Sequence, residues 1–153
     1  MCIVAEKEFH KYLDTRLYNM QQIELIGEAI QTGFSEEEIA IAANPDFHWE
    51  QMREVIRGFM AGLPLEQVKQ YAKTCYNPRQ MYQIYLAMMV GCSQTKLNIL
   101  LDKRFDAGQM SVIRLGFLSG LTVMDVKRFA DPMLSSDVMQ NYRMEIEKEK
   151  SFK

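Results

Sequence analysis

The densest group of side chains that could do chemistry is a run of three carboxylates, Glu36, Glu37 and Glu38, in the stretch "SEEEIA". Adjacent carboxylates can bind a hard divalent cation, and they also stabilise the N-terminal end of a helix through its dipole. The run begins directly after Ser35, a residue type that caps helices, and Glu38 completes a capping box with it. We therefore favour a helix N-terminus over a metal site here.

The residue types that most often act as nucleophiles, bases or zinc ligands are few. They are Cys2, Cys75, Cys92, His10 and His48. The cysteines show no C-x-x-C spacing, whereas a zinc site needs about four Cys or His ligands close together. The sequence also has no phosphate loop or dinucleotide fingerprint. We expect no metal, no cofactor, reduced thiols and no enzymatic activity, and a closed polar pocket around His48 and Trp49 is the residual enzyme hypothesis.

Length and composition indicate one globular domain over residues 1–153. The chain is 48% hydrophobic and 25% charged, which is ordinary for a protein that buries a sizeable core. Its apolar runs are far shorter than the roughly 20 residues that cross a bilayer. The start "MCIVAEKEF" lacks the basic flank and long apolar stretch of a secretory signal. We expect a cytoplasmic protein without a membrane span.

A 29-residue repeat is the main signal in the sequence. The phrase "QMREVIRG" at residues 51–58 returns as "QMSVIRLG" at residues 109–116. Steps of 29 residues align one anchor position without gaps, and the anchors are Ile23, Met52, Met81, Met110 and Met139. A small residue follows six positions after each of the first four anchors, and a glycine follows ten positions after. These glycines are Gly33, Gly62, Gly91 and Gly120.

Each repeat predicts a long helix, a glycine turn, a short helix and a loop. Large apolar residues at the anchor and three and seven positions after it follow the spacing of a helix stripe, and a glycine suits the left-handed residue that ends a helix. Four positions before each anchor stand the expected helix caps, Asn19, His48, Asn77, Asp106 and Ser135, of which all but the histidine are good capping types. The short helix begins after a second set of caps, Ser35, Ser93 and Thr122, with Pro64 as the exception.

One such repeat cannot bury enough apolar surface alone, so repeats must stack. We predict an all-α solenoid with about ten helices and a 29-residue period. It comprises an N-terminal capping helix within residues 1–17, four repeats over residues 18–133, and a partial repeat with a capping helix over residues 134–153. We expect Tyr142 and Ile146 to continue the core stripe, and the tail "EIEKEKSFK" to be a solvated helix end.

The segment "FDAGQMSVIRLGFLSGLTVMDVKRFADP" resembles a tandem motif, F-D-x-x-Q-M-x-x-I-R-x-G-(F/L)-x-x-G-L, found in uncharacterised helical-repeat proteins of bacteria and their mobile elements. The resemblance covers residues 18–144 and is strongest in the second and fourth repeats. The third repeat departs from it, with Tyr76 and Asn77 in place of Phe-Asp and Ala87 in place of the first Gly. The resemblance implies a helical scaffold and no established chemistry.

The repeats differ on one face of the long helix, at the positions one, five and eight residues after the anchor. The first repeat carries Glu24, Glu28 and Gln31 there, and the third and fourth repeats are mainly apolar. The second repeat, with Arg53, Arg57 and Met60, is intermediate. Either the middle repeats pack more deeply, or an exposed apolar patch marks a partner site. Our first hypothesis is a non-enzymatic protein interaction module, an adaptor or inhibitor, as a monomer or homodimer. Its candidate partner-binding residues are Arg57, Met60, Tyr82, Leu86, Met89, Leu115 and Leu118.

Charge is segregated along the chain. Residues 1–66 hold 12 acidic and 5 basic residues, and residues 67–130 hold 3 acidic and 9 basic residues. The basic stretch predicts either a solvated face, electrostatic steering toward a charged protein, or binding to nucleic acid. The alternative hypothesis is therefore a nucleic-acid-binding repeat protein. Its candidate residues are Lys69, Lys73, Lys96, Lys103, Arg104, Lys127 and Arg128.

Overall fold

The structure is a computed structural model that describes residues 10–12 and 16–151. Within these residues the chain forms nine α-helices, one short 3-10 helix and no strand, which confirms the predicted all-α class. The chain divides into two compact units, residues 1–81 and residues 82–153. The predicted N-terminal capping helix falls largely outside the described residues, and the part described includes the 3-10 helix η1 (His10–Tyr12).

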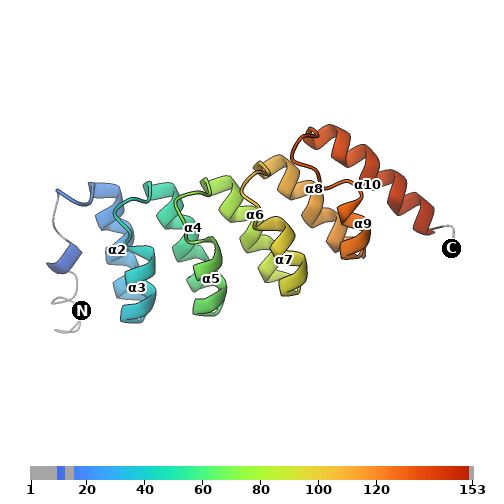
Figure 1. The fold of residues 1–153 in the computed structure, drawn as a ribbon. Helices are drawn as coiled ribbons and strands as arrows, with labels where there is room; N and C mark the ends of the chain where they lie inside the picture. Colours follow the sequence, from blue (N-terminus) through green and yellow to red (C-terminus); the bar gives the residue numbers. More distant parts are fainter. Residues whose placement is uncertain (1–9, 13–15, 152–153) are drawn as a thin grey trace. The chain divides into compact units, whose positions relative to one another are not determined.

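Long and short helices alternate along the chain (Figure 1), as the repeat predicts. The first unit contains α2 (Met20–Thr32), α3 (Glu36–Ala42), α4 (Trp49–Met60) and α5 (Leu65–Tyr71). Here α4 contacts α2, α3 and α5. The second unit contains α7 (Gln94–Leu100), α8 (Ala107–Leu118), α9 (Val123–Lys127) and α10 (Ser136–Ser151). The unit boundary falls within α6 (Pro78–Met89), whose proline occupies the first helical position, where its missing N–H costs nothing.

The glycine turns end the long helices as predicted. All four turn glycines have positive φ, between 79° and 95°, which side chains with a Cβ rarely adopt. In the second repeat, the N–H of Leu63 donates to the carbonyl of Gly58 at 3.1 Å, and the N–H of Gly62 donates to Phe59 at 3.0 Å. This pair of hydrogen bonds is a Schellman motif, and it satisfies carbonyls that the helix end would leave unpaired.

The caps at the helix starts also follow the sequence. The side chains of Asn19 and Asp106 accept from the third helical N–H, and Ser35 and Thr122 cap the short helices in the same way. His48 caps its helix at the expected position although histidine is not a usual capping type, and its Nδ1 accepts from the N–H of Glu50 at 3.4 Å. A histidine thus replaces the usual oxygen cap in the second repeat.

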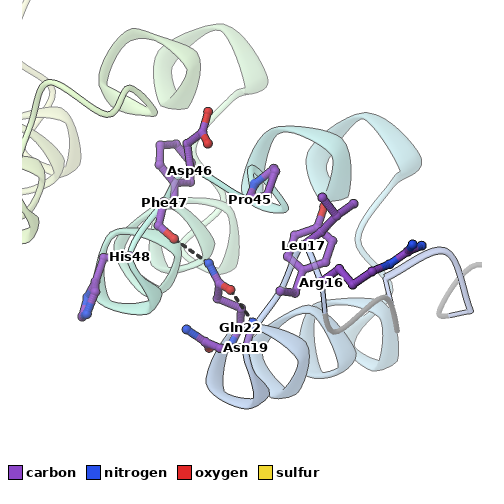
Figure 2. Close-up of a pocket in the computed structure, with 9 residues that line it drawn as sticks. Arg16, Leu17, Asn19, Gln22, Pro45, Asp46, Phe47 and His48 are labelled. Carbon is purple, nitrogen blue, oxygen red and sulfur yellow. Dashed lines mark hydrogen bonds between the residues drawn. The ribbon is translucent and has the colours of Figure 1, made fainter.

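In the first, second and fourth repeats, a glutamine directly before the anchor links its own helix start to the next repeat. In the first repeat, the Gln22 side-chain oxygen accepts from the N–H of Asn19 at 2.7 Å, and its amide donates to the carbonyl of Phe47 at 2.6 Å (Figure 2). The same donation, 25 residues along the chain, joins Gln51 to Tyr76 at 2.7 Å and Gln109 to Leu134 at 2.6 Å. We call this two-sided contact the glutamine clamp.

The core is built from the predicted positions. The methionine anchors are fully buried, and so are Val68 and Tyr71 of α5 and Leu97 and Leu100 of α7. The small residue six positions after the anchor lets the short helix approach closely. A Cβ added at Gly58 would lie 2.0 Å from the Tyr71 hydroxyl, and one added at Gly116 would lie 3.2 Å from Phe129. These glycines are therefore required by packing and not by chemistry.

The C-terminal helix follows the expected core stripe at Ile146 but not at Tyr142. α10 packs against α8 and buries Met139 and Ile146. Tyr142, which was expected to continue the core stripe, is instead 47% exposed. The reason is that within the described residues no short helix follows α10 to cover that position.

Ion pairs fasten the charged end of α10 to α9. Glu149 pairs with Arg128 at 3.1 Å, and Lys150 pairs with Asp125. The hydrogen bonds from Lys150 and from the N–H and hydroxyl of Thr122 lower the pKa of Asp125 to about 2. The described part of the tail is exposed at most of its positions, as expected of a solvated helix end, and two of its charges also pair with side chains of the preceding repeat.

The glutamine clamp predicts a large effect from a change of one atom type. Gln22→Glu keeps the oxygen that accepts from Asn19 but removes the donor to Phe47. We expect the free energy of unfolding to fall by about 2 kcal/mol, because the buried Phe47 carbonyl loses its partner and meets a carboxylate. Gln21→Glu, at the exposed neighbouring position, should change it by less than about 0.5 kcal/mol. Urea unfolding followed by circular dichroism measures both, and equal effects would contradict the clamp.

The close approach at Gly58 predicts a coupled pair of substitutions. Gly58→Ala should destabilise the protein by about 2 kcal/mol, because its methyl group would overlap the Tyr71 hydroxyl. Tyr71→Phe removes that oxygen. The double variant should therefore lose about 1 kcal/mol less stability than the sum of the losses in the two single variants. Gly62→Ala, where an added Cβ meets no atom within 4 Å, should cost about 1 kcal/mol from backbone strain alone. Thermal unfolding of the four variants tests the overlap, and additive effects would contradict it.

Candidate functional site

The candidate partner-binding residues lie on one face of the long helices α4, α6 and α8. We call the positions one, five and eight residues after each anchor the outer face. Its apolar side chains at the eighth position are exposed in three successive repeats, by 53% at Met60, 46% at Met89 and 59% at Leu118. Tyr82 is 37% exposed, and Leu86 and Leu115 are half-buried. Deeper packing of the middle repeats therefore does not account for the exposed side chains.

In the second unit, a side-chain hydrogen bond joins α6 to α8 beside their outer faces. The Arg114 guanidinium on α8 donates from Nε to the side-chain oxygen of Gln83 on α6 at 2.9 Å. On α6, the rings of Tyr82 and Tyr85 stack with centroids 5.9 Å apart. A hydrogen bond thus links α6, which carries Tyr82, Leu86 and Met89, to α8.

Arg57, on the outer face of α4, forms an ion pair with a buried carboxylate. Its Nε lies 3.0 Å from Oε2 of Glu54, a residue that is 5% exposed. The contact lacks hydrogen-bond geometry, so Oε2 of Glu54 has no hydrogen-bond partner. Burial therefore raises the pKa of Glu54, although Arg57 and Arg53 oppose that shift. Arg57 shields this carboxylate and is only partly available to a partner.

The candidate nucleic-acid residues are largely engaged within the protein. Acidic partners lie beside Lys69, Arg104 and Arg128, at 3.6 Å, 2.7 Å and 3.1 Å respectively. The Lys96 ammonium lies 5.4 Å from the centre of the Phe117 ring. Lys73, Lys103 and Lys127 are exposed. In the first unit, Lys69 and Lys73 share an open hollow of about 460 Å³ between α3 and α5.

A second hollow, of about 470 Å³, lies between the start of α2 and the loop that precedes α4 (Figure 2). The amide of Gln22 in its wall is held by the clamp, and the Tyr18 hydroxyl donates to the Ala43 carbonyl at 2.7 Å. His48 lines the hollow and caps α4, whereas Trp49 is not part of the lining. This open hollow is not the closed polar pocket that the residual enzyme hypothesis requires.

The remaining chemically capable residues do not converge. Across residues 10–12 and 16–151, no three His, Cys, Asp or Glu side chains are grouped so that they could hold a metal ion. The three glutamates of α3 form its first turn, as favoured from the sequence, with Ser35 and Glu38 in a capping box. Cys75 is exposed, and burial raises the pKa of Cys92, which keeps that thiol neutral. Cys2 lies outside the described residues.

Sequence reasoning missed two residues beside the outer face, Glu54 and Arg114. Glu54 stands two positions after its anchor, where the first repeat has the apolar Leu25. Arg114 stands four positions after its anchor, where the second repeat has the apolar Ile56. The signal in the sequence was a charged residue at a position that is apolar in another repeat. The role of such a residue depends on its neighbours in the adjacent repeat, and the sequence alone does not place them.

Within the part of the chain that the structure describes, no helix combines the length and apolarity needed to cross a membrane. Comparison with protein-family models, with curated proteins and with solved structures found no match. Function must therefore be argued from the surfaces described above.

Glu54 predicts a pH-dependent stability. Because its folded pKa is raised above the ordinary value of 4.5, its contribution to stability is fully present below that value. The contribution is lost as pH rises through the folded pKa, when the buried carboxyl group ionises. Glu54→Gln should therefore raise the free energy of unfolding by about 1 kcal/mol at pH 7 and change it little at pH 4.

Thermal unfolding at the two pH values measures this difference. Glu24→Gln, an exposed position on α2, is the matched control and should show no such difference. A destabilised Glu54→Gln variant at pH 7 would mean that the Arg57 ion pair outweighs the burial of the charge.

Proposed function

We propose that the chain is a helical solenoid with a 29-residue period that serves as a rigid scaffold. The glycine turns, the buried anchors and the glutamine clamps recur at that period and support this architecture. Each recurring residue is used by the fold itself. A scaffold of this kind leaves function to positions where the repeats differ.

We propose further that the outer face docks a protein partner, and that the chain acts without catalysis as an adaptor or inhibitor. Apolar side chains exposed at the eighth position of three repeats, Met60 in the first unit and Met89 and Leu118 in the second, carry this proposal. Methionine side chains adapt to irregular surfaces, and tyrosine is enriched at interface centres. Exposure recurs at this one repeat position, whereas scattered exposed apolar residues would show no register.

A protein partner fits this surface better than nucleic acid. Phosphate recognition needs uncommitted cations in number, and three of the seven candidate basic side chains already have acidic partners. The exposed groups of the outer face are apolar and aromatic, which suits the desolvated centre of a protein interface.

Substitution of two of these exposed side chains tests the docking function. Met60→Glu and Met89→Glu, singly and together, should reduce capture of the partner at least about tenfold, which corresponds to about 1.4 kcal/mol. The folded state should persist, because both side chains are already exposed. The measurement is quantitative mass spectrometry of proteins retained from native lysate by the immobilised full chain.

Met124→Glu is the matched control, since Met124 is 74% exposed but lies on the short helix α9. Proteins retained by the wild type and by this control, and lost from the outer-face variants, are the expected result. The proposal fails if the outer-face variants retain the same proteins at the same levels, or if the wild type retains none above an empty matrix.

A further inference from the structure

Two arginines occupy the same repeat position on neighbouring long helices. Arg114 on α8 and Arg143 on α10 both stand four residues after their anchors, and both are half-buried. α8 and α10 pack against each other. A guanidinium keeps its charge under all ordinary conditions, so each of these partly desolvated groups calls for an acceptor.

Arg143 is neutralised within the chain. Its Nη1 donates to Oε1 of Glu147, one helical turn further on, at 2.6 Å. The same carboxylate accepts from the Ser119 hydroxyl at 2.5 Å. A carboxylate four residues after the arginine therefore satisfies the charge at this position of the repeat.

Arg114 has no such carboxylate. The residue four positions after it is Leu118, which is apolar and 59% exposed. Arg114 donates from Nε to Gln83, a neutral amide, and no carboxylate of the described residues pairs with it. The nearby Cys92 thiol is neutral and cannot balance the charge. The apolar part of the outer face thus holds one cation that lacks the partner its equivalent has.

We propose that Arg114 binds a carboxylate of the protein partner, and that the partner segment is an acidic amphipathic helix. Its apolar side chains would lie on Tyr82 and Met89 of α6 and on Leu115 of α8, on either side of the guanidinium. This inference rests on the proposed docking function and names the chemistry of its partner. Arginine suits the role because its planar fork holds a carboxylate in a fixed orientation.

The dimensions of the site favour a helix over an extended strand. The axes of packed helices lie about 8–10 Å apart, and side chains seven residues apart on one helix are separated by about 10 Å. One helix laid across α6 and α8 can therefore place an apolar side chain on each, with an acidic residue between them. Anchors at this spacing are typical of helices bound in grooves.

Panning a random peptide library against the immobilised full chain tests the proposal. Phage-displayed peptides of roughly 15 residues are long enough to form a helix on binding. We expect recovered peptides to be enriched in Asp or Glu with large apolar residues three or four positions away. Enrichment in Lys or Arg would overturn the proposal, and so would enrichment in runs of Asp and Glu that lack apolar residues.

Two substitutions give the sharper test. Arg114→Gln keeps a side-chain donor toward Gln83 but removes the charge. A synthetic acidic peptide from the selection should bind this variant at least about tenfold more weakly, and its Glu→Gln analogue should bind the variant and the wild type equally. Leu118→Glu places a carboxylate where α10 has Glu147. The new carboxylate should neutralise Arg114 within the chain. It should therefore weaken binding of the acidic peptide more than Leu118→Gln does.

These outcomes separate the two proposals. If peptides bind and Met89→Glu abolishes binding, but Arg114→Gln leaves the acidic preference intact, docking stands and the role of Arg114 is wrong. If the wild-type chain recovers no more peptide than the Met89→Glu variant does, the acidic helix proposal fails. The capture of proteins from lysate then tests the docking function independently. Circular dichroism melts of each variant confirm that the fold is retained.

Discussion

The rest of the structure depends on the amide of one repeated glutamine. In the second repeat the side chain of Gln51 accepts from the N–H of His48 at 2.8 Å and donates to the carbonyl of Tyr76 at 2.7 Å. The first hydrogen bond starts a helix, and the second sets the distance to the start of the next one. Because a buried carbonyl that loses its donor is costly, a shift of one residue between repeats that breaks this hydrogen bond is unfavourable. The gapless spacing in the sequence is the consequence.

Much of the fold could be predicted because its signals act over a few residues. Asn19 caps its own helix, and Gly62 ends one through a backbone conformation that other residues resist. The clamp was not predicted, although its glutamine was noticed, since its acceptor lies 25 residues away. The same limit explains the charged end of α10, where Lys150 reaches back to Asp125.

The candidate site was predictable only as a pattern of differences between repeats. The sequence places Met60 and Met89 at one repeat position, and the structure adds that both are exposed. It could not indicate that Arg57 covers a buried carboxylate, or that Arg114 touches α6. Both facts depend on side chains from other positions of the repeat, where one substitution changes what a neighbour needs. The residues that the fold uses and those that we propose for recognition thus lie on different faces of the same helices.

The reach of the clamp also bears on how the chain folds. Every contact that it makes lies within about one repeat of its donor, so the mean sequence separation of contacting residues is small. Chains with such low contact order fold quickly, and repeat arrays can nucleate at any adjacent pair and grow from there. The same locality lets one end open while the other stays folded. Unfolding should therefore be read as the sum of neighbouring equilibria, with the terminal repeats the first to exchange their amide hydrogens.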